Sequence, residues 1–155
     1  MRRKLLLVLL VLILLFIWGQ SCLPSALSDR ESGSVLDASR PFLERLLGEG
    51  RVTMYLIRKL AHFAEYFALG CVASLLFPLS LHRQALCAGL CLLAGLLDET
   101  IQIFSGRGDQ VRDIWLDFAG ALAAILIVCL LRRPAAKKRC GKMAPGEENG
   151  RENKS

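Results

Sequence analysis

Residues 85–104 read ALCAGLCLLAGLLDETIQIF, and this stretch decides the fold class. It reaches the roughly 20 residues that a helix needs to cross the hydrocarbon core of a bilayer. Asp98 and Glu99 near its end are ionisable, and such side chains cost about 2.5 kcal/mol or more each at the bilayer centre. The stretch therefore predicts a transmembrane helix that carries part of a polar site.

Three other stretches are similarly apolar, and apolar residues make up 54% of the 155-residue chain, more than in an ordinary soluble domain. Arg2, Arg3 and Lys4 before a leucine-rich run also resemble the start of a secretory signal peptide. Because no clear small-residue cleavage site follows, we interpret that run as an uncleaved helix. The chain is predicted to be all-α, a polytopic membrane protein with one bundle of four transmembrane helices, over residues 5–22, 52–77, 84–104 and 111–131.

The distribution of basic residues predicts the orientation, because lysine and arginine are enriched in cytoplasmic segments near helix ends. Placing residues 1–4, Arg83 and the tail 132–155 in the cytoplasm puts twelve of the twenty basic residues on that side. We therefore expect a multi-pass protein with both termini cytoplasmic and a disordered basic tail that anchors the topology. This distribution favours contact with membrane lipids and argues against a nucleic-acid partner.

The segment 23–51 between the first two helices is too long for a simple connection and should be partly structured. Apolar residues recur in it with charged residues between them, at Val35, Leu36, Phe42, Leu43, Leu46 and Leu47. This spacing predicts a short amphipathic helix on the outer membrane surface. We expect it to be broken or restarted at Pro41 and stopped by Gly48.

Ionisable and polar residues of the last three helices converge at the extracytoplasmic end of this topology. Helical geometry places Arg58, His62 and Glu65 within about 60° of arc. Gly120 and Ala124 follow the acidic residues of the last helix on one stripe and form a small-xxx-small pair, which permits close helix approach. The predicted outer-leaflet polar pocket is lined by Arg58, Lys59, His62, Glu65, Asp98, Glu99, Gln102, Arg107, Asp113 and Asp117.

These charges also admit a purely structural interpretation, because charges in a membrane must find partners whatever else they do. In one specific form of this structural interpretation, Lys59 and Glu65 are buried partners of each other. In its general form, four basic residues neutralise four acidic ones: Arg58, Lys59, Arg107 and Arg112 against Glu65, Asp98, Glu99 and Asp117. For the whole set we favour a functional site, because a bundle can be held together by packing alone.

The six cysteines do not form a disulfide framework, because four lie within predicted helices and Cys22 and Cys140 fall on opposite sides of the membrane. Cys87 and Cys91 are one helical turn apart. We interpret them as apolar packing residues rather than as a soft-metal pair. The sequence assigns no metal site and no cofactor.

Three ordered motifs stand out: Arg58-Lys59-x-x-His62-Phe63-x-Glu65-Tyr66, Asp98-Glu99-x-x-Gln102-x-Phe104 and Asp113-x-x-x-Asp117-x-x-Gly120. With Arg107 and the Gln20-Ser21 pair after the first helix, they resemble the VanZ-like family of bacterial membrane proteins over residues 16–131. The named member of that family is associated with low-level teicoplanin resistance. Ala124 stands where the family pattern has a second glycine, and the proline expected before Arg107 is missing. The resemblance implies an integral protein of the bacterial cell membrane and supplies no mechanism.

Together these features predict a non-enzymatic protein of the cell envelope. Its pocket would bind a glycopeptide antibiotic or a lipid-linked cell-wall precursor, and would thereby lower effective teicoplanin binding. Arg58, Lys59 and Arg107 would meet phosphate or carboxylate groups. The carboxylates would orient those cations or accept hydrogen bonds from sugars and amides.

Two alternatives stay open. A membrane-embedded hydrolase or transferase acting on a lipid-linked phosphate or glycan would use His62 as a general base oriented by Glu65, or His62 and carboxylates around a divalent cation. Its candidates are His62, Glu65, Asp98 and Glu99, but no catalytic residue is assigned because no serine or cysteine nucleophile is evident among them. An ion- or proton-coupled carrier is the second alternative. Four helices are few for that task, and the sequence leaves the oligomeric state open.

Overall fold

The computed structural model describes residues 2–23, 33, 36–45, 48, 52–105 and 112–140, the side chains of 112 and 133–140 excepted. Every regular element within these residues is a helix. The four long helices are α1 (Arg2–Ser21), α3 (Met54–Leu76), α4 (Leu81–Phe104) and α5 (Arg112–Cys140), and a short helix covers residues 36–45. Each long helix contains a segment long and apolar enough to cross a membrane, which confirms the all-α fold with four spans.

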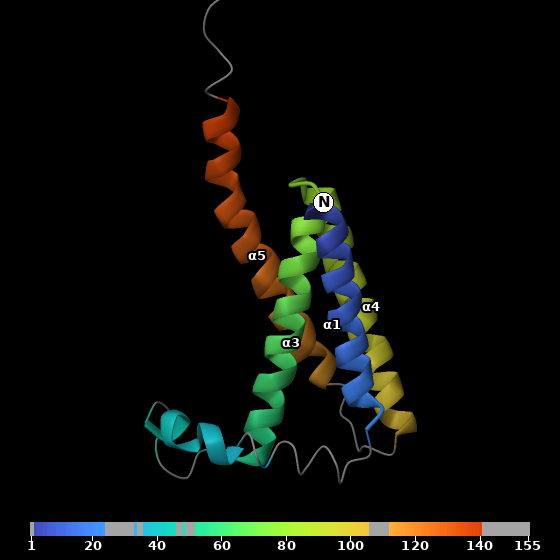
Figure 1. Cartoon of the computed structure of the whole chain (residues 1–155), viewed down its shortest axis with the longest axis vertical. Coiled ribbons are helices and arrows are strands. Elements are labelled where there is room, and N and C mark those ends of the chain that lie inside the picture. Colours follow the sequence, from blue (N-terminus) through green and yellow to red (C-terminus); the bar gives the residue numbers. More distant parts are fainter. Residues whose placement is uncertain are drawn as a thin grey trace, which may run out of the picture.

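The long helices alternate in direction along the chain (Figure 1). The start of α1, the turn between α3 and α4 and the carboxyl-terminal part of α5 lie toward one end, which we call the basic end after Arg2, Arg3, Lys4, Arg83 and Arg132. The short helix 36–45, the start of α3 and the end of α4 lie toward the opposite end. The predicted polar residues of α3, α4 and α5 therefore belong to the half of the bundle away from the basic end.

Two hydroxyl caps set where α3 and α4 begin. The Thr53 side-chain oxygen accepts a hydrogen bond from the Leu56 N–H at 3.2 Å, and that of Ser80 accepts one from the Arg83 N–H at 3.4 Å. Each cap satisfies one of the N–H groups that the first helical turn leaves without a main-chain partner. Because of the Ser80 cap, α4 begins at Leu81 and not at residue 84 as the hydropathy predicts.

The helices α3 and α5 approach each other closely at two glycines. A Cβ atom at Gly70 would lie 2.5 Å from the carbonyl oxygen of Ala121, and one at Gly120 would lie 2.5 Å from that of Phe63. Only glycine permits backbones this close, so the close approach predicted at Gly120 is confirmed. Ala124, one turn further along α5, is fully buried. This crossing turns the Asp117 face of α5 toward α3.

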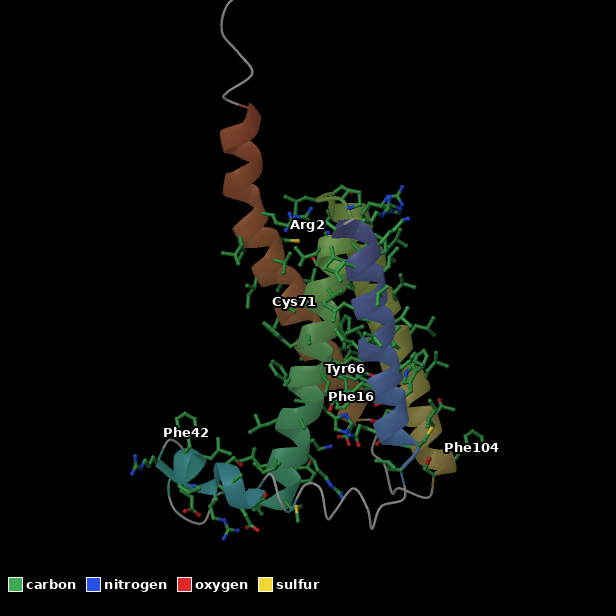
Figure 2. The ribbon with its side chains drawn as sticks, viewed as in Figure 1. Arg2, Phe16, Phe42, Tyr66, Cys71 and Phe104 are labelled. Atoms are coloured by element: carbon green, nitrogen blue, oxygen red, sulfur yellow. The ribbon has the colours of Figure 1, made fainter. Side chains whose placement is uncertain are left out.

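The centre of the bundle is filled mostly by small and medium-sized apolar side chains: Ile17, Tyr66, Leu69, Ala73, Cys87, Cys91, Ala94, Ala121 and Ile125. Larger apolar side chains cover the outside, among them Leu12, Leu90 and Leu126. Phe104 at the end of α4 is also exposed and points away from the bundle (Figure 2). An apolar exterior of this extent suits contact with lipid. The cysteines whose side chains the structure describes are all free, and Cys87 and Cys91 lie in the core as packing residues.

The short helix between α1 and α3 packs against the start of α3. Leu36 of this helix contacts Val52 and Ile57 in a small second core. The helix continues through Pro41, where the sequence predicts a break or restart, because proline removes only one main-chain hydrogen bond from it. Gly48 follows with φ at 91°, and its N–H donates to the Glu44 carbonyl oxygen at 2.9 Å, as is common after a helix C-terminus.

The last helix is longer than predicted. It continues to Cys140, whereas the sequence predicts an end at Leu131 and a disordered tail over residues 132–155. Pro134 removes one hydrogen bond without ending the helix, and residues 135–139 are alanine, lysine and arginine, which favour helix. Residues 141–155 lie outside the described part of the chain.

Candidate functional site

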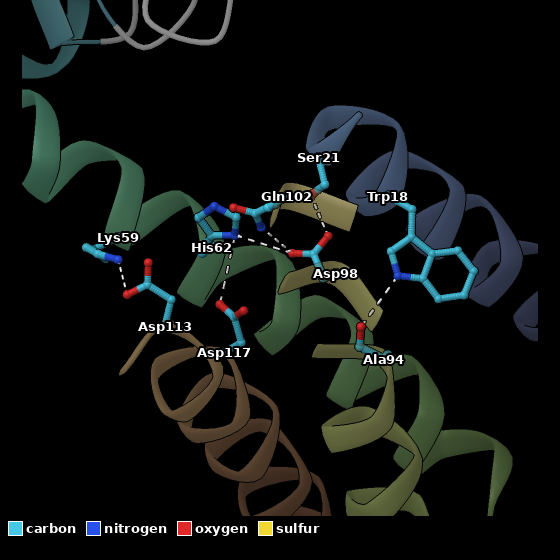
Figure 3. A network of polar contacts seen from close by, with 9 residues as sticks. All are labelled: Trp18, Ser21, Lys59, His62, Ala94, Asp98, Gln102, Asp113 and Asp117. Atoms are coloured by element: carbon cyan, nitrogen blue, oxygen red, sulfur yellow. Dashed lines mark hydrogen bonds and ion pairs between the residues drawn. The ribbon is translucent and has the colours of Figure 1, made fainter. Parts of the chain in front are cut away.

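All four long helices contribute to one buried polar cluster in the half of the bundle away from the basic end (Figure 3). We use the name polar cluster for Ser21 of α1, His62 of α3, Asp98 and Gln102 of α4, and Asp117 of α5. Four of these five residues are predicted pocket residues, so the structure brings together side chains that are 55 positions apart in the sequence, from His62 to Asp117. Their convergence requires the helix packing described above.

Asp98 lies at the centre of the polar cluster, and its side chain is fully buried. The Ser21 hydroxyl donates a hydrogen bond to Oδ1 of Asp98, and Nε2 of Gln102 donates one to Oδ2 at 2.9 Å. Trp18, one turn before Ser21, directs its indole N–H to the carbonyl oxygen of Ala94 at 3.5 Å. These contacts hold α1 against α4 and fix the orientation of the Asp98 carboxylate.

His62 connects two carboxylates that belong to different helices. Its Nδ1 atom lies 4.0 Å from Oδ2 of Asp98 and 3.9 Å from Oδ1 of Asp117. The side chain of His62 is 24% exposed, whereas those of Asp98 and Asp117 are at most 1% exposed. His62 is therefore the edge of the polar cluster that reaches the surface of the protein.

Asp117 and Tyr66 are buried without full hydrogen bonding. Within the part of the chain that the structure describes, the two carboxylate oxygens of Asp117 and the hydroxyl of Tyr66 have no hydrogen-bond partner. Both residues have an exposed fraction of 0%. Gly95 of α4 leaves space beside them: a Cβ atom there would lie 3.9 Å from both Asp117 Cβ and the Tyr66 hydroxyl oxygen. A buried polar group without a partner is unusual and calls for an explanation.

Lys59 forms an ion pair with Asp113 at the partly buried border of the polar cluster. The partner of Lys59 is thus on α5, and it is not Glu65, the partner that the sequence analysis considers. The reason is geometric, because residues six apart on one helix point about 120° away from each other. Lys59 also lies over the ring of Tyr55, 4.9 Å from its centroid.

The other predicted site residues surround the polar cluster. Glu65 of α3 is partly buried and within electrostatic reach of Asp98. Arg58 of α3 is also partly buried, and Glu99 of α4 is 5% exposed. Arg107, which the prediction includes, lies outside the described residues, as does the side chain of Arg112.

A second polar network lies at the basic end, and its side chains form hydrogen bonds with one another and with main-chain carbonyl oxygens. The Ser74 hydroxyl donates to Oε1 of Gln84 at 2.7 Å, while Nε2 of Gln84 faces the carbonyl oxygen of Pro78 at 3.1 Å. Nη1 of Arg132 donates to the carbonyl oxygens of Ser74 at 2.9 Å and of Phe77 at 3.1 Å. These side chains satisfy carbonyl groups that a helix C-terminus leaves without main-chain donors. The network has a structural explanation, and the polar cluster around Asp117 does not.

Sequence reasoning missed three members of the site. Ser21, Trp18 and Tyr66 all take part in it or pack beside it. Ser21 is buried against Asp98, so the cluster contains a serine that the sequence analysis does not place there. A signal existed in the Gln20-Ser21 and Glu65-Tyr66 pairs of the family motifs, but which way these side chains point depends on the rotation of α1 and α3.

The fold and the site define the class: a multi-pass helical membrane protein with a buried polar cluster built by all four long helices. The particular family follows from comparison, since a family model described as VanZ/LLP1 matches residues 5–132. The chain belongs to the VanZ/LLP1 family, and the resemblance drawn from the three motifs is confirmed. No curated protein and no solved structure matches the chain.

Proposed function

We propose that the protein binds the polar head of a lipid-linked cell-wall molecule at the extracytoplasmic side of the bacterial cell membrane. Through this binding it lowers the effective binding of a glycopeptide such as teicoplanin. The orientation in the proposal follows from the basic end, because arginine and lysine near helix ends favour the cytoplasm. The polar cluster then lies in the outer half of the membrane, the side from which a glycopeptide reaches the cell.

One observation carries the proposal: among the described residues both oxygens of Asp117 in the polar cluster lack a hydrogen-bond donor, whereas Ser74, Gln84 and Arg132 at the basic end are hydrogen-bonded. A buried charged group without a hydrogen-bond donor destabilises a fold by about 1–3 kcal/mol or more. The contact of Asp117 with His62, at 3.9 Å, is longer than a hydrogen bond. Helix packing does not require this carboxylate, because α3 and α5 are already in backbone contact at Gly70 and Gly120. A ligand that fills the cluster would supply the donor that Asp117 lacks among the described residues.

The chemistry of the cluster and its border suits a ligand that carries both phosphate and hydroxyl or amide groups. The carboxylates of Asp98, Glu99 and Asp117 accept hydrogen bonds, as sugar hydroxyls and amide N–H groups require. Lys59, at the partly buried border, supplies an ammonium for a phosphate oxygen. A lipid-linked glycan headgroup combines these features, and its lipid tail would lie along the apolar exterior of the bundle.

The test is binding of a polyprenyl diphosphate-linked disaccharide to the full chain in detergent, measured by native mass spectrometry. We expect wild type to retain it in preference to phosphatidylglycerol. Asp117→Asn should weaken binding at least about tenfold, since a hydrogen bond to a charged group contributes about 1.5–3 kcal/mol. Asp37→Asn makes the same chemical change on the exposed face of the short helix and should bind as wild type does. Equal retention by all three proteins, or equal retention of the two lipids, would refute the proposal.

The two alternative functions receive less support from the geometry. A nucleophilic serine needs a base that accepts its proton, but the Ser21 hydroxyl is directed to Asp98, which is itself bound by Gln102, and not to His62. A carrier needs polar groups that continue toward the other side of the membrane. At the basic end, the described polar side chains of Gln84 and Arg132 are engaged with main-chain carbonyls.

A further inference from the structure

We infer that His62, Asp98 and Asp117 form a binding site for one divalent transition-metal ion such as Zn²⁺. One imidazole nitrogen and one oxygen from each carboxylate lie within 4.8 Å of one another. The three residues come from α3, α4 and α5, so the site exists only in the folded bundle. An imidazole with two carboxylates is a donor set that zinc and its neighbours in the transition series accept.

The separations of the donor atoms are close to those that one ion requires. Nδ1 of His62 lies 4.0 Å from Oδ2 of Asp98 and 3.9 Å from Oδ1 of Asp117. Atoms that bind one zinc ion at about 2.0–2.2 Å lie roughly 3–3.5 Å apart. The donor atoms lie within 4.8 Å of one another, so binding one ion requires small side-chain movements of both carboxylates as well as of the partly exposed His62 ring. Figure 3 shows the three side chains pointing toward one another.

Asp117 is the second, independent observation that points to a cation. Its carboxylate is fully buried, and neither oxygen has a hydrogen-bond donor within the described residues. It also lies within electrostatic reach of four further carboxylates, those of Asp98, Glu99, Asp113 and Glu65. A metal ion would supply the missing partner and would offset this concentration of negative charge.

The neighbours of Asp98 are arranged as the outer shell of a metal site is. Ser21 donates to one of its oxygens and Gln102 to the other, which fixes the plane of the carboxylate. Such outer-shell donors orient a ligating carboxylate toward the metal. His62, with its 24% exposed side chain, gives the ion a route into the cluster.

Three protein ligands leave at least one coordination position open, as in zinc sites that bind a further molecule. If the proposed function holds, a phosphate oxygen of the lipid-linked ligand would take that position. The metal site itself does not depend on that ligand, because it is measured with Zn²⁺ alone.

The experiment uses the full chain in detergent, stripped with a chelator and titrated with Zn²⁺ against a competing chromophoric chelator. We expect one ion per wild-type chain, with Mg²⁺ binding far more weakly. Loss of an outer-shell partner weakens metal binding about 10- to 100-fold, so removal of a ligand in Asp117→Asn or His62→Gln should weaken it at least about 100-fold. Asp37→Asn makes the same chemical change on the exposed face of the short helix, away from the three ligands, and should stay within a few-fold of wild type. Circular dichroism shows whether each variant is folded.

Absence of stoichiometric Zn²⁺ binding to the folded wild-type chain would overturn the inference. Zn²⁺ binding that persists in both ligand variants would overturn it too, and would assign the ion to other donors such as Cys87 and Cys91. The outcome separates from that of the proposed function. Zinc binding without retention of the lipid-linked disaccharide refutes only the latter, and retention without zinc refutes only the metal site.

Discussion

Replacing Gly70 with alanine should destabilise the bundle, although alanine is the better helix former. The new Cβ atom would lie 2.5 Å from the carbonyl oxygen of Ala121, whereas ordinary contacts begin at 3.4 Å. The nearest atoms belong to the α5 backbone, so no side-chain rotation can relieve the overlap. The two helices must separate where they now touch.

The magnitude follows from two opposing contributions. Overpacking of a tight interface costs about 1–3 kcal/mol, and more where the backbone must move. Alanine in place of glycine in a helix interior returns about 1 kcal/mol. Gly89 of α4 provides the matched control, because a Cβ atom there would meet no atom within 4 Å. Gly89→Ala should therefore be neutral or mildly stabilising. Because both variants gain the same helix propensity, they should differ by the overpacking cost, about 1–3 kcal/mol.

The assay is unfolding of the full chain in mixed detergent micelles, with increasing sodium dodecyl sulfate and helix content as the signal. We expect Gly70→Ala to unfold at a lower fraction of the denaturing detergent than wild type, and Gly120→Ala to behave in the same way, because its Cβ atom would lie 2.5 Å from the Phe63 carbonyl oxygen. Gly89→Ala should unfold with wild type or later. Equal stability of Gly70→Ala and Gly89→Ala would refute the close crossing of α3 and α5.

Three further predictions concern polar contacts and orientation. A double-mutant cycle of Lys59→Gln and Asp113→Asn should give a coupling of about 1 kcal/mol in the same assay, and a coupling near zero would mean that the ion pair does not form. Arg132→Gln should lower the unfolding free energy by about 1.5–3 kcal/mol, since it removes charged hydrogen bonds to two carbonyls; the exposed Arg2→Gln is its control, and equal effects would contradict the capping role. Cys22, which is exposed at the end of α1, should react in intact cells with a membrane-impermeant maleimide when the other cysteines are replaced. Labelling only after permeabilisation would reverse the orientation.

Much of the fold could be predicted from the sequence, because hydropathy and helix caps act locally. The four spans follow from long apolar runs, and the close approach at Gly120 follows from the small-residue spacing with Ala124. The predicted ends of the helices are less accurate than the predicted spans. The Ser80 cap begins α4 earlier than its apolar run does, and good helix formers extend α5 to Cys140 beyond the apolar segment.

The sequence predicts in part which residues belong to the candidate site. It does not predict which of these residues contact one another. His62, Asp98 and Asp117 stand out because ionisable residues in apolar runs are rare. Which of them meet depends on how each helix is rotated about its axis, and that rotation is set by glycine contacts between α3 and α5. The same dependence explains why Lys59 pairs with Asp113, and why the Gln20-Ser21 pair does not by itself place Ser21 in the cluster.

The most direct test of the central claim is teicoplanin susceptibility in a sensitive Gram-positive host, comparing wild type with Asp117→Asn at matched membrane levels and with vancomycin alongside. Asp117→Asn removes a buried carboxylate that has no hydrogen-bond donor among the described residues, so the variant's unfolding free energy should equal or exceed that of wild type. If the polar cluster binds the ligand, wild type should protect against teicoplanin and the folded Asp117→Asn variant should not. Equal protection by both proteins, or none by wild type, would contradict a ligand-binding role for the polar cluster.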